Sequence, residues 1–234
     1  MQSCEYVKRN YEKLLDEIEK YENLYGRKIT VVAVTKSGSD EEVLALAAAG
    51  VTDVAENRPS ELKRRAELLR NNGFSPRFHE IGNLQRNKVK LVISDAELIH
   101  SVDKYELAVE ISRRAVALGM TAKVLIEINS AKEEAKGGVL PEDAEELYLK
   151  VRELPSVSVK GLMTMGPALA SEEDMRPYFR LTKNIFDRIK STYGFDGDGI
   201  LSMGMSNSYT VAIEEGSTLI RVGRKLFEKT KGDI

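Results

Sequence analysis

The chain lacks the residues that usually stabilise a small secreted protein. It has one cysteine, Cys4, and no tryptophan among 234 residues. A single cysteine excludes an internal disulfide framework and fits a reducing compartment. Stability must therefore come from a hydrophobic core, and a hydrophobic fraction of 42% is sufficient for a sizeable one.

The sequence also lacks the features of a membrane protein or a nucleic-acid-binding protein. No apolar run approaches the length needed to cross a bilayer, and residues 1–5 contain no apolar targeting core. The 35 basic and 37 acidic residues leave a net charge of -2, so positive charge for nucleic acid or an anionic membrane is not in excess. We therefore expect a soluble, cytoplasmic protein with neither of these partners.

Short apolar runs alternate with helical patterns along the chain. Residues 6–25 carry apolar side chains at helical spacing. Runs of strand character follow at residues 29–35, 51–55, 78–81, 98–102, 123–128, 158–163, 199–203 and 218–222. Eight such units predict an α/β fold, a single (β/α)8 TIM barrel over residues 1–234 with an N-terminal helical extension over residues 1–26. An open doubly wound sheet is the alternative.

A lysine follows the first of these runs. The consecutive small or β-branched residues of 31–34 predict a strand buried on both faces, and Lys36 lies at its tip. An amine at the mouth of an apolar core loses hydration, which favours the neutral form that attacks aldehydes and forms Schiff bases. Taken alone, the run fits an ordinary solvated lysine at a strand end better than a Schiff-base lysine, because most lysines are exposed.

The last two strand ends carry a candidate phosphate site. Barrels often bind phosphate at the loops after strands seven and eight, where backbone N–H groups begin a helix. Gly204 and Gly223 let the backbone approach an anion closely, and Ser206 can donate a hydroxyl. The N–H groups of Gly223 and Arg224 can point at the same oxygens. Ordinary turns explain the glycines alone about as well.

Closure of a barrel would join this phosphate site to the lysine. Strand eight then neighbours strand one, which brings Arg221 beside Lys36. A lysine that reacts with aldehydes beside a phosphate cradle is what pyridoxal 5′-phosphate (PLP) requires. A metal site is not predicted, because His79 and His100 are not accompanied by spaced carboxylates or cysteines.

Five segments form an ordered set of motifs along essentially the whole chain. They read Val-Ala-Val-Thr-Lys (32–36), His-Glu-Ile-Gly-Asn-Leu-Gln-Arg-Asn-Lys (79–88), Gly-Leu-Met-Thr-Met (161–165), Leu-Ser-Met-Gly-Met-Ser (201–206) and Ile-Arg-Val-Gly-Arg-Lys-Leu-Phe (220–227). The set resembles the YggS/PROSC family of pyridoxal phosphate homeostasis proteins, also called PLP-binding proteins. The resemblance implies a single PLP-bearing barrel similar to the N-terminal domain of alanine racemase.

The resemblance also implies a role for each matching residue. Lys36 would carry PLP as a covalent internal aldimine, and Ser206 with the backbone of Gly223 and Arg224 would hold the phosphate. Arg221 would face the pyridine nitrogen and keep it unprotonated, because a second adjacent positive charge is disfavoured. A neutral ring is a poorer electron sink, so carbanion chemistry would be damped. The ring would be lined by Asn57, Met205 and His79.

The chain departs from the family pattern at several positions. Ala55 and Arg58 stand where glycine and tyrosine are usual, Glu80 replaces phenylalanine, and Glu228 replaces glycine. These changes leave the lysine and the phosphate cradle in place. They concern the lining of the site and any partner surface of the family.

Three functions fit such a lysine. The first is a PLP carrier in vitamin B6 and amino-acid homeostasis, not itself an enzyme, that exchanges PLP with apo PLP-dependent enzymes or amino acids. The second is a PLP-dependent amino-acid racemase, which needs proton transfer on both faces of a carbon. The enzymatic relatives take the second group from an added domain and a facing subunit, and Tyr209 is a conceivable substitute here. The third is a Schiff-base aldolase, for which a lysine on a later strand is expected.

The first function needs no partner domain, which predicts a monomer or a weak dimer.

Overall fold

The computed structural model describes residues 4–133, 135–167 and 171–230. The elements in these ranges are α1 (Glu5–Tyr25), β1 (Thr30–Val34), α2 (Asp40–Ala48), β2 (Asp53–Glu56), α3 (Pro59–Asn71), β3 (Arg77–Glu80), the 3-10 helix η2 (Arg86–Leu91), β4 (Ala96–Val102), α4 (Tyr105–Ala117), β5 (Ala122–Ile128), α5 (Ala144–Arg152), β6 (Val157–Thr164), the 3-10 helix η3 (Glu173–Met175), α6 (Arg176–Tyr193), β7 (Ile200–Met205), α7 (Tyr209–Glu214), β8 (Leu219–Val222) and α8 (Arg224–Phe227). Each of the eight predicted runs contains or overlaps a strand.

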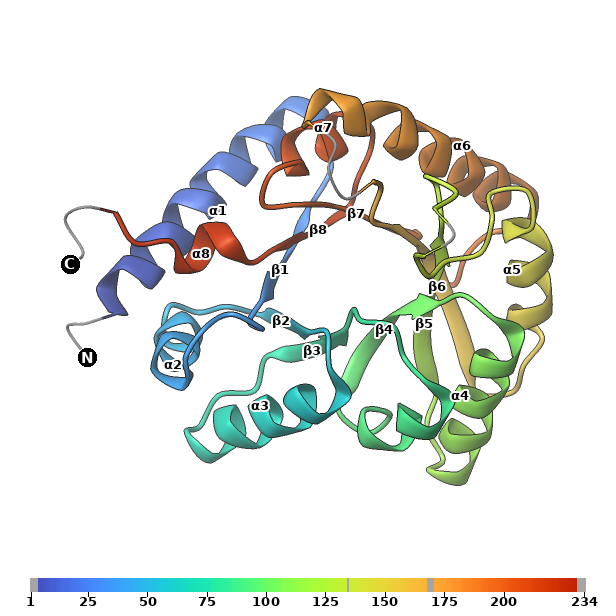
Figure 1. The fold of residues 1–234 in the computed structure, drawn as a ribbon, viewed down its shortest axis with the longest axis horizontal. Coiled ribbons are helices and arrows are strands. Elements are labelled where there is room, and N and C mark those ends of the chain that lie inside the picture. Colours follow the sequence, from blue (N-terminus) through green and yellow to red (C-terminus); the bar gives the residue numbers. More distant parts are fainter. Residues whose placement is uncertain (1–3, 134, 168–170, 231–234) are drawn as a thin grey trace.

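The strands form a closed parallel barrel in the order β1 to β8, with β8 paired to β1. Figure 1 shows the helices around the outside of this ring of strands. The (β/α)8 prediction is therefore confirmed, and the open doubly wound sheet is excluded because β1 and β8 are neighbours. Among the described residues, no helix is both long and apolar enough to span a membrane.

Apolar side chains form two layers on either side of the barrel wall. The layer inside the barrel consists of Val32, Val34, Ala55, Leu98, Leu125, Met163 and Leu219. A larger layer lies between the strands and the surrounding helices. Residues in a strand point alternately to these two layers, so every second position of a barrel strand faces the interior.

Helix α1 covers the place where β8 meets β1 and fixes the last helix of the chain. It ends at Gly26, which adopts the left-handed conformation with φ 62°. Asn10 donates hydrogen bonds to the backbone oxygens of Leu226 and Glu228. Glu17 pairs with Lys225 at 3.2 Å. Figure 1 shows α1 alongside α7 and α8, so the predicted N-terminal extension supports the loops that follow β7 and β8.

Glu80, one of the departures from the family pattern, lies in a buried carboxyl pair. It stands opposite Glu56 on the neighbouring strand, and the two residues are 0% and 2% exposed. Glu56 accepts a hydrogen bond from the Thr35 hydroxyl at 2.6 Å. Burial raises the pKa of Glu80 to about 8, opposed by a hydrogen bond from the Gly82 backbone and assisted by the charge of Glu56. The folded protein therefore keeps Glu80 protonated at neutral pH.

We expect Glu80→Gln to stabilise the protein at alkaline pH. The folded state holds a proton on Glu80 up to about pH 8, whereas an exposed glutamate releases it near about pH 4.3. The unfolded chain thus binds fewer protons between these values, and the free energy of unfolding of the wild type falls as pH rises. Glutamine does not titrate and still accepts from the Gly82 N–H, so the variant should gain on the order of 2–4 kcal/mol at pH values above about 8.

Urea unfolding at acidic and alkaline pH measures this effect. Glu153→Gln is the control, because the Glu153 side chain is 81% exposed. The wild type and Glu153→Gln should lose stability in parallel between the two pH values, and Glu80→Gln should lose less. Equal losses in all three proteins would show that Glu80 is ionised in the folded state.

Candidate cofactor site at the barrel mouth

A cavity of about 570 Å³ opens at the carboxyl ends of the barrel strands. Strand-end residues from around the barrel line it, as a TIM-barrel site requires. Seven of the predicted site residues are among them: Lys36, Asn57, Met205, Ser206, Arg221, Gly223 and Arg224. The structure therefore brings together residues that are up to 188 positions apart (224 − 36) in the sequence.

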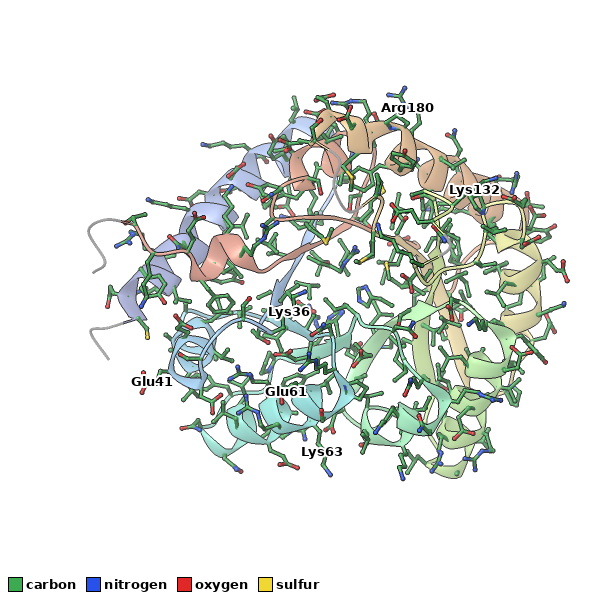
Figure 2. The ribbon with its side chains drawn as sticks, viewed as in Figure 1. Lys36, Glu41, Glu61, Lys63, Lys132 and Arg180 are labelled. Atoms are coloured by element: carbon green, nitrogen blue, oxygen red, sulfur yellow. The ribbon has the colours of Figure 1, made fainter. Side chains whose placement is uncertain are left out.

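Lys36 lies two residues beyond the end of β1 and is exposed towards the cavity. Figure 2 shows it near the end of β1, inside the ring of strands. The preceding residue, Thr35, is buried and donates its hydroxyl to Glu56. This bond anchors the chain immediately before Lys36, so the amine extends from a fixed backbone.

Ser206 lies against the N-terminus of α8. Its Oγ accepts from the backbone N–H groups of Gly223 at 3.2 Å and Lys225 at 3.5 Å. Because these bonds use the oxygen as acceptor, the hydroxyl hydrogen of Ser206 remains able to donate to an anion. Gly204 adopts φ 92°, and a Cβ there would lie 2.6 Å from Ala212, so glycine is required where the chain turns towards this loop. Ser206 and the backbone of Gly223 therefore meet at the rim of the cavity, and their role in holding a phosphate stays a prediction.

Arg221 is the largest fully buried side chain of the barrel, with 2% exposure. Its Nη1 donates to Ser202 Oγ at 2.5 Å, and its Nη2 donates to the backbone oxygen of Thr164 at 2.9 Å. Burial lowers the pKa of Arg221 to about 10, while the charge of Glu127 opposes this shift. The guanidinium therefore stays positive at neutral pH and borders the cavity from below.

Glu127 is a cavity residue that the sequence analysis missed. It lies on β5, where Lys123 is the other charged residue, and it lines the cavity with Arg221. Burial raises the pKa of Glu127 to about 7, Asp103 adds to the rise, and Arg221 opposes it. Its position two residues after the interior Leu125 was the available signal, since alternate strand residues share a face.

His79 does not line the cavity, so the prediction that it contacts the ring was wrong. It is 3% exposed inside the barrel, where its Nε2 lies 3.0 Å from Asp53 Oδ1 and its Nδ1 lies 2.9 Å from His100 Nε2. It lies in register with Ala55 and Leu98, which both face the barrel interior. His79 comes two residues before Ile81 and four residues before Asn83, which line the cavity, so its ring ends below the site.

Asn57 reaches the cavity because the next loop lies directly against it. A Cβ on Gly82 would lie 2.0 Å from the backbone oxygen of Asn57. Only glycine allows this contact, which fixes the backbone after β2. The departures Ala55, Arg58, Glu80 and Glu228 are not among the described lining residues, so they leave the cavity surface unchanged.

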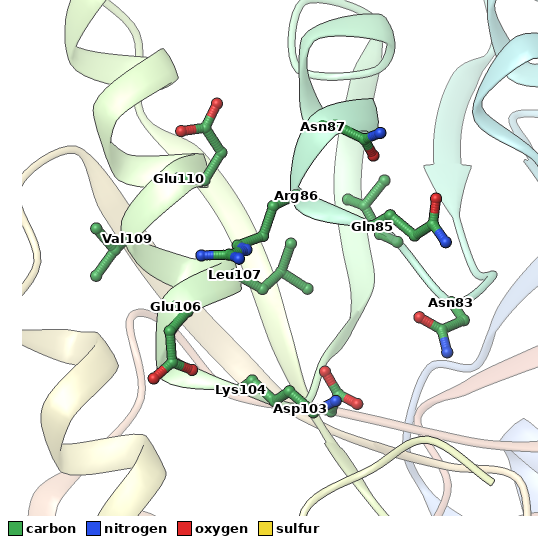
Figure 3. A pocket seen from close by; sticks show the side chains of 11 residues that line it. Asn83, Gln85, Arg86, Asn87, Asp103, Lys104, Glu106, Leu107, Val109 and Glu110 are labelled. Atoms are coloured by element: carbon green, nitrogen blue, oxygen red, sulfur yellow. The ribbon is translucent and has the colours of Figure 1, made fainter. Parts of the chain in front are cut away.

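A larger groove of about 990 Å³ lies beside the cavity, between η2 and α4. Figure 3 shows Arg86 reaching across it towards α4 near Glu106. Gln85 and Asn87 line this groove, and Gln85 makes no side-chain capping bond to η2. Lys104 lines this groove, but of the residues that the structure describes no serine or glycine stands with it there, as Ser206 and Gly223 stand with Lys36 in the smaller cavity. We therefore assign the candidate cofactor site to the smaller cavity.

Comparisons with known proteins match the chain over nearly its full length. The family model for the alanine racemase N-terminal domain matches residues 9–230. The pyridoxal phosphate homeostasis protein of Aquifex aeolicus is 39% identical, with 99% of this chain and 100% of the relative covered. The chain belongs to the family of pyridoxal phosphate homeostasis proteins.

Other members of this family support the same assignment. The pyridoxal phosphate homeostasis protein of Helicobacter pylori is 34% identical, covering 95% of this chain and 98% of the relative. PipY of Synechococcus elongatus has been solved with PLP bound, and that structure matches with a TM-score of 0.83 and 26% identity. The match covers 95% of this chain and 100% of PipY. The predicted family resemblance is therefore confirmed.

Proposed function

We propose that this protein binds PLP at the barrel mouth, through a Schiff base with Lys36, and takes part in PLP homeostasis. The observation that carries the proposal is one cavity containing an amine, an anion cradle and a buried cation. These groups match the aldehyde, the phosphate and the pyridine nitrogen of PLP. The binding of PLP by PipY supports the proposal.

The residues of the cavity fit PLP group by group. The Ser206 hydroxyl and the backbone N–H groups at Gly223 and Arg224 would hold the phosphate. Arg221 would face the pyridine nitrogen, with three of its five N–H donors left after its bonds to Ser202 and Thr164. The remaining surface of the ring would lie against Asn57 and Met205.

Two observations favour a carrier over a racemase. Arg221 holds a permanent positive charge where the ring nitrogen would lie, which disfavours the protonated ring that stabilises carbanions. Tyr209, the conceivable second proton donor, gives its hydroxyl to Glu17 at 2.7 Å and accepts from Lys225. No tyrosine lines the cavity within the described part of the chain. We therefore propose that exchange of PLP, with apo PLP-dependent enzymes or amino acids, replaces turnover.

Titration of the purified protein with PLP tests this function. A visible Schiff-base band that saturates at one equivalent, with no racemisation of added amino acids, is the expected result. A protein that stays colourless with excess PLP would contradict the proposed binding. Racemisation of an amino acid by the yellow protein would instead support the racemase.

We expect Ser206→Ala to weaken PLP retention without abolishing the covalent link. The variant loses one donor to the phosphate, and the Gly223 N–H loses its acceptor. A charge-assisted hydrogen bond contributes about 1.5–3 kcal/mol, so the dissociation constant should rise by about one to two orders of magnitude. Dialysis against buffer followed by absorbance measures the retained PLP. Retention equal to the wild type would remove Ser206 from the phosphate site.

We also propose that the protein is a monomer or a weak dimer, since every group of the proposed site comes from one chain. Light scattering coupled to size exclusion should give a mass close to 26.1 kDa at low protein concentration. A dimer that persists on dilution would contradict this expectation.

A further inference from the structure

A chain of hydrogen bonds crosses the barrel interior below the cavity. It links Arg221 to Ser202, His100, His79 and Asp53, which are at most 3% exposed. The donor–acceptor distances along it are 2.5 Å, 3.0 Å, 2.9 Å and 3.0 Å. The five residues come from β8, β7, β4, β3 and β2, so the chain spans the barrel from one wall to the other.

The two ends of this chain fix the direction of every bond. A guanidinium only donates and a carboxylate only accepts. Ser202 Oγ therefore accepts from Arg221 and donates to Nδ1 of His100, which leaves the His100 hydrogen on Nε2. His79 accepts that hydrogen at Nδ1 and donates from its own Nε2 to Asp53. Both histidines are then neutral Nε2–H tautomers, and every polar atom along these hydrogen bonds has a partner.

A positively charged histidine would break this pattern. If His79 were cationic, it would donate at both nitrogens, and His100 would have to donate to Ser202 from Nδ1. Ser202 Oγ would then accept from both His100 and Arg221. The hydroxyl hydrogen of Ser202 would have no acceptor among these five residues. Burial, with contributions from His79 and Arg221, holds the pKa of His100 well below its usual range. His100 is thus neutral in either pattern, and the pairing of every polar atom along these hydrogen bonds favours the pattern in which His79 is neutral as well.

The Asp53 end of this series of hydrogen bonds is itself anchored. Arg77 donates to Asp53 from Nε at 2.7 Å and from Nη2 at 2.6 Å, and Thr52 donates at 2.7 Å. Although burial raises the pKa of Asp53, the bonds from His79 and Arg77 hold it well below its usual range. Asp53 is thus a fixed carboxylate at the end of the barrel opposite the cavity.

We propose that Ser202, His100, His79 and Asp53 form a positioning relay for Arg221. The relay and the Thr164 backbone oxygen hold two guanidinium nitrogens in fixed directions and leave the other N–H donors for the cavity. The relay connects the charge of Arg221 to the carboxylate of Asp53 through neutral groups. The effect of the relay on the cofactor rests on the proposed PLP binding, whereas the geometry of the relay does not depend on that proposal.

Nitrogen NMR of the cofactor-free protein tests the relay without PLP. The chain has only two histidines, so both can be assigned with His79→Gln. The expected result at neutral pH is two neutral Nε2–H rings and a guanidinium signal of Arg221 that exchanges slowly with water. A cationic ring, or an Nδ1–H tautomer on either histidine, would overturn the relay.

Ser202→Ala tests the positioning role, with Ser217→Ala as its control. Both serines are 0% exposed, but Ser217 Oγ contacts only the backbone oxygens of Leu201, Met203 and Leu219. Ser202→Ala should speed the exchange of the Arg221 guanidinium. It should also shift the pH midpoint of the bound-PLP absorbance by about one unit, a tenfold change in that equilibrium.

The outcomes separate the relay from the proposed function. Ser217→Ala should leave the Arg221 signal and the absorbance midpoint as in the wild type. Equal behaviour of Ser202→Ala and Ser217→Ala in both measurements would overturn the positioning role. Loss of PLP binding by the wild type, with the predicted tautomers and slow Arg221 exchange intact, would contradict the proposed function alone. If Ser202→Ala does not fold, the tautomers of the wild type still decide the relay.

Discussion

Replacing Lys36 by alanine should abolish the covalent attachment of PLP and leave the barrel folded. Lys36 is exposed at the end of β1, so truncation removes no packing from the interior. The phosphate cradle and Arg221 remain, and they should retain PLP without a covalent bond about a hundredfold more weakly, a loss of about 3 kcal/mol. Borohydride reduction followed by mass spectrometry measures the attached cofactor.

Lys63→Ala is a suitable control for this experiment. Lys63 is an exposed residue of α3, on the outside of the barrel and away from the cavity (Figure 2). The control should trap one PLP per chain, like the wild type. A Lys36→Ala protein that still traps PLP would show that another lysine carries the cofactor.

Gly82→Ala should impair both stability and PLP binding. The added Cβ would lie 2.0 Å from the backbone oxygen of Asn57 and 2.7 Å from its carbonyl carbon. Backbone atoms cannot move away as a flexible side chain can, so one of the loops after β2 and β3 must shift. We expect a loss of about 1–3 kcal/mol in the free energy of unfolding and at least about tenfold weaker PLP retention.

Gly73→Ala separates this steric effect from backbone strain. Gly73 has φ 82°, but a Cβ there would meet nothing within 4 Å. Its replacement should cost about 1–2 kcal/mol through the left-handed backbone alone and leave PLP retention unchanged. Urea unfolding and dialysis of both variants provide the measurements. Normal PLP retention by Gly82→Ala would show that the contact with Asn57 does not position the site.

The barrel could be predicted because its strands are short apolar runs that alternate regularly with helices. The same alternation placed Lys36, Ser206 and Arg221 at strand ends, and closure of the barrel then brought them together. These positions follow from the order of elements alone. The assignment of residues 1–234 to one domain stays a prediction.

The interior of the barrel could not be predicted in the same way. Whether His79 faces the cavity or the barrel axis depends on strand register, which the 78–81 run does not specify. Its partners His100 and Asp53 lie 21 and 26 positions away in the sequence, and His100 in turn bonds to Ser202, 102 positions further on. The relay therefore exists only after closure of the barrel. Glu127 could not be predicted in the same way, because β5 carries charged residues at both Lys123 and Glu127 and the sequence does not show which of them faces the cavity.

The most direct test of PLP attachment at Lys36 is peptide mapping of the wild-type protein after it has been loaded with PLP and reduced with borohydride. We predict a yellow protein before reduction and a single pyridoxyl-modified peptide, with the modification on Lys36. A modification on a different lysine would contradict the proposed site. A protein that never turns yellow and carries no modification would contradict PLP binding itself.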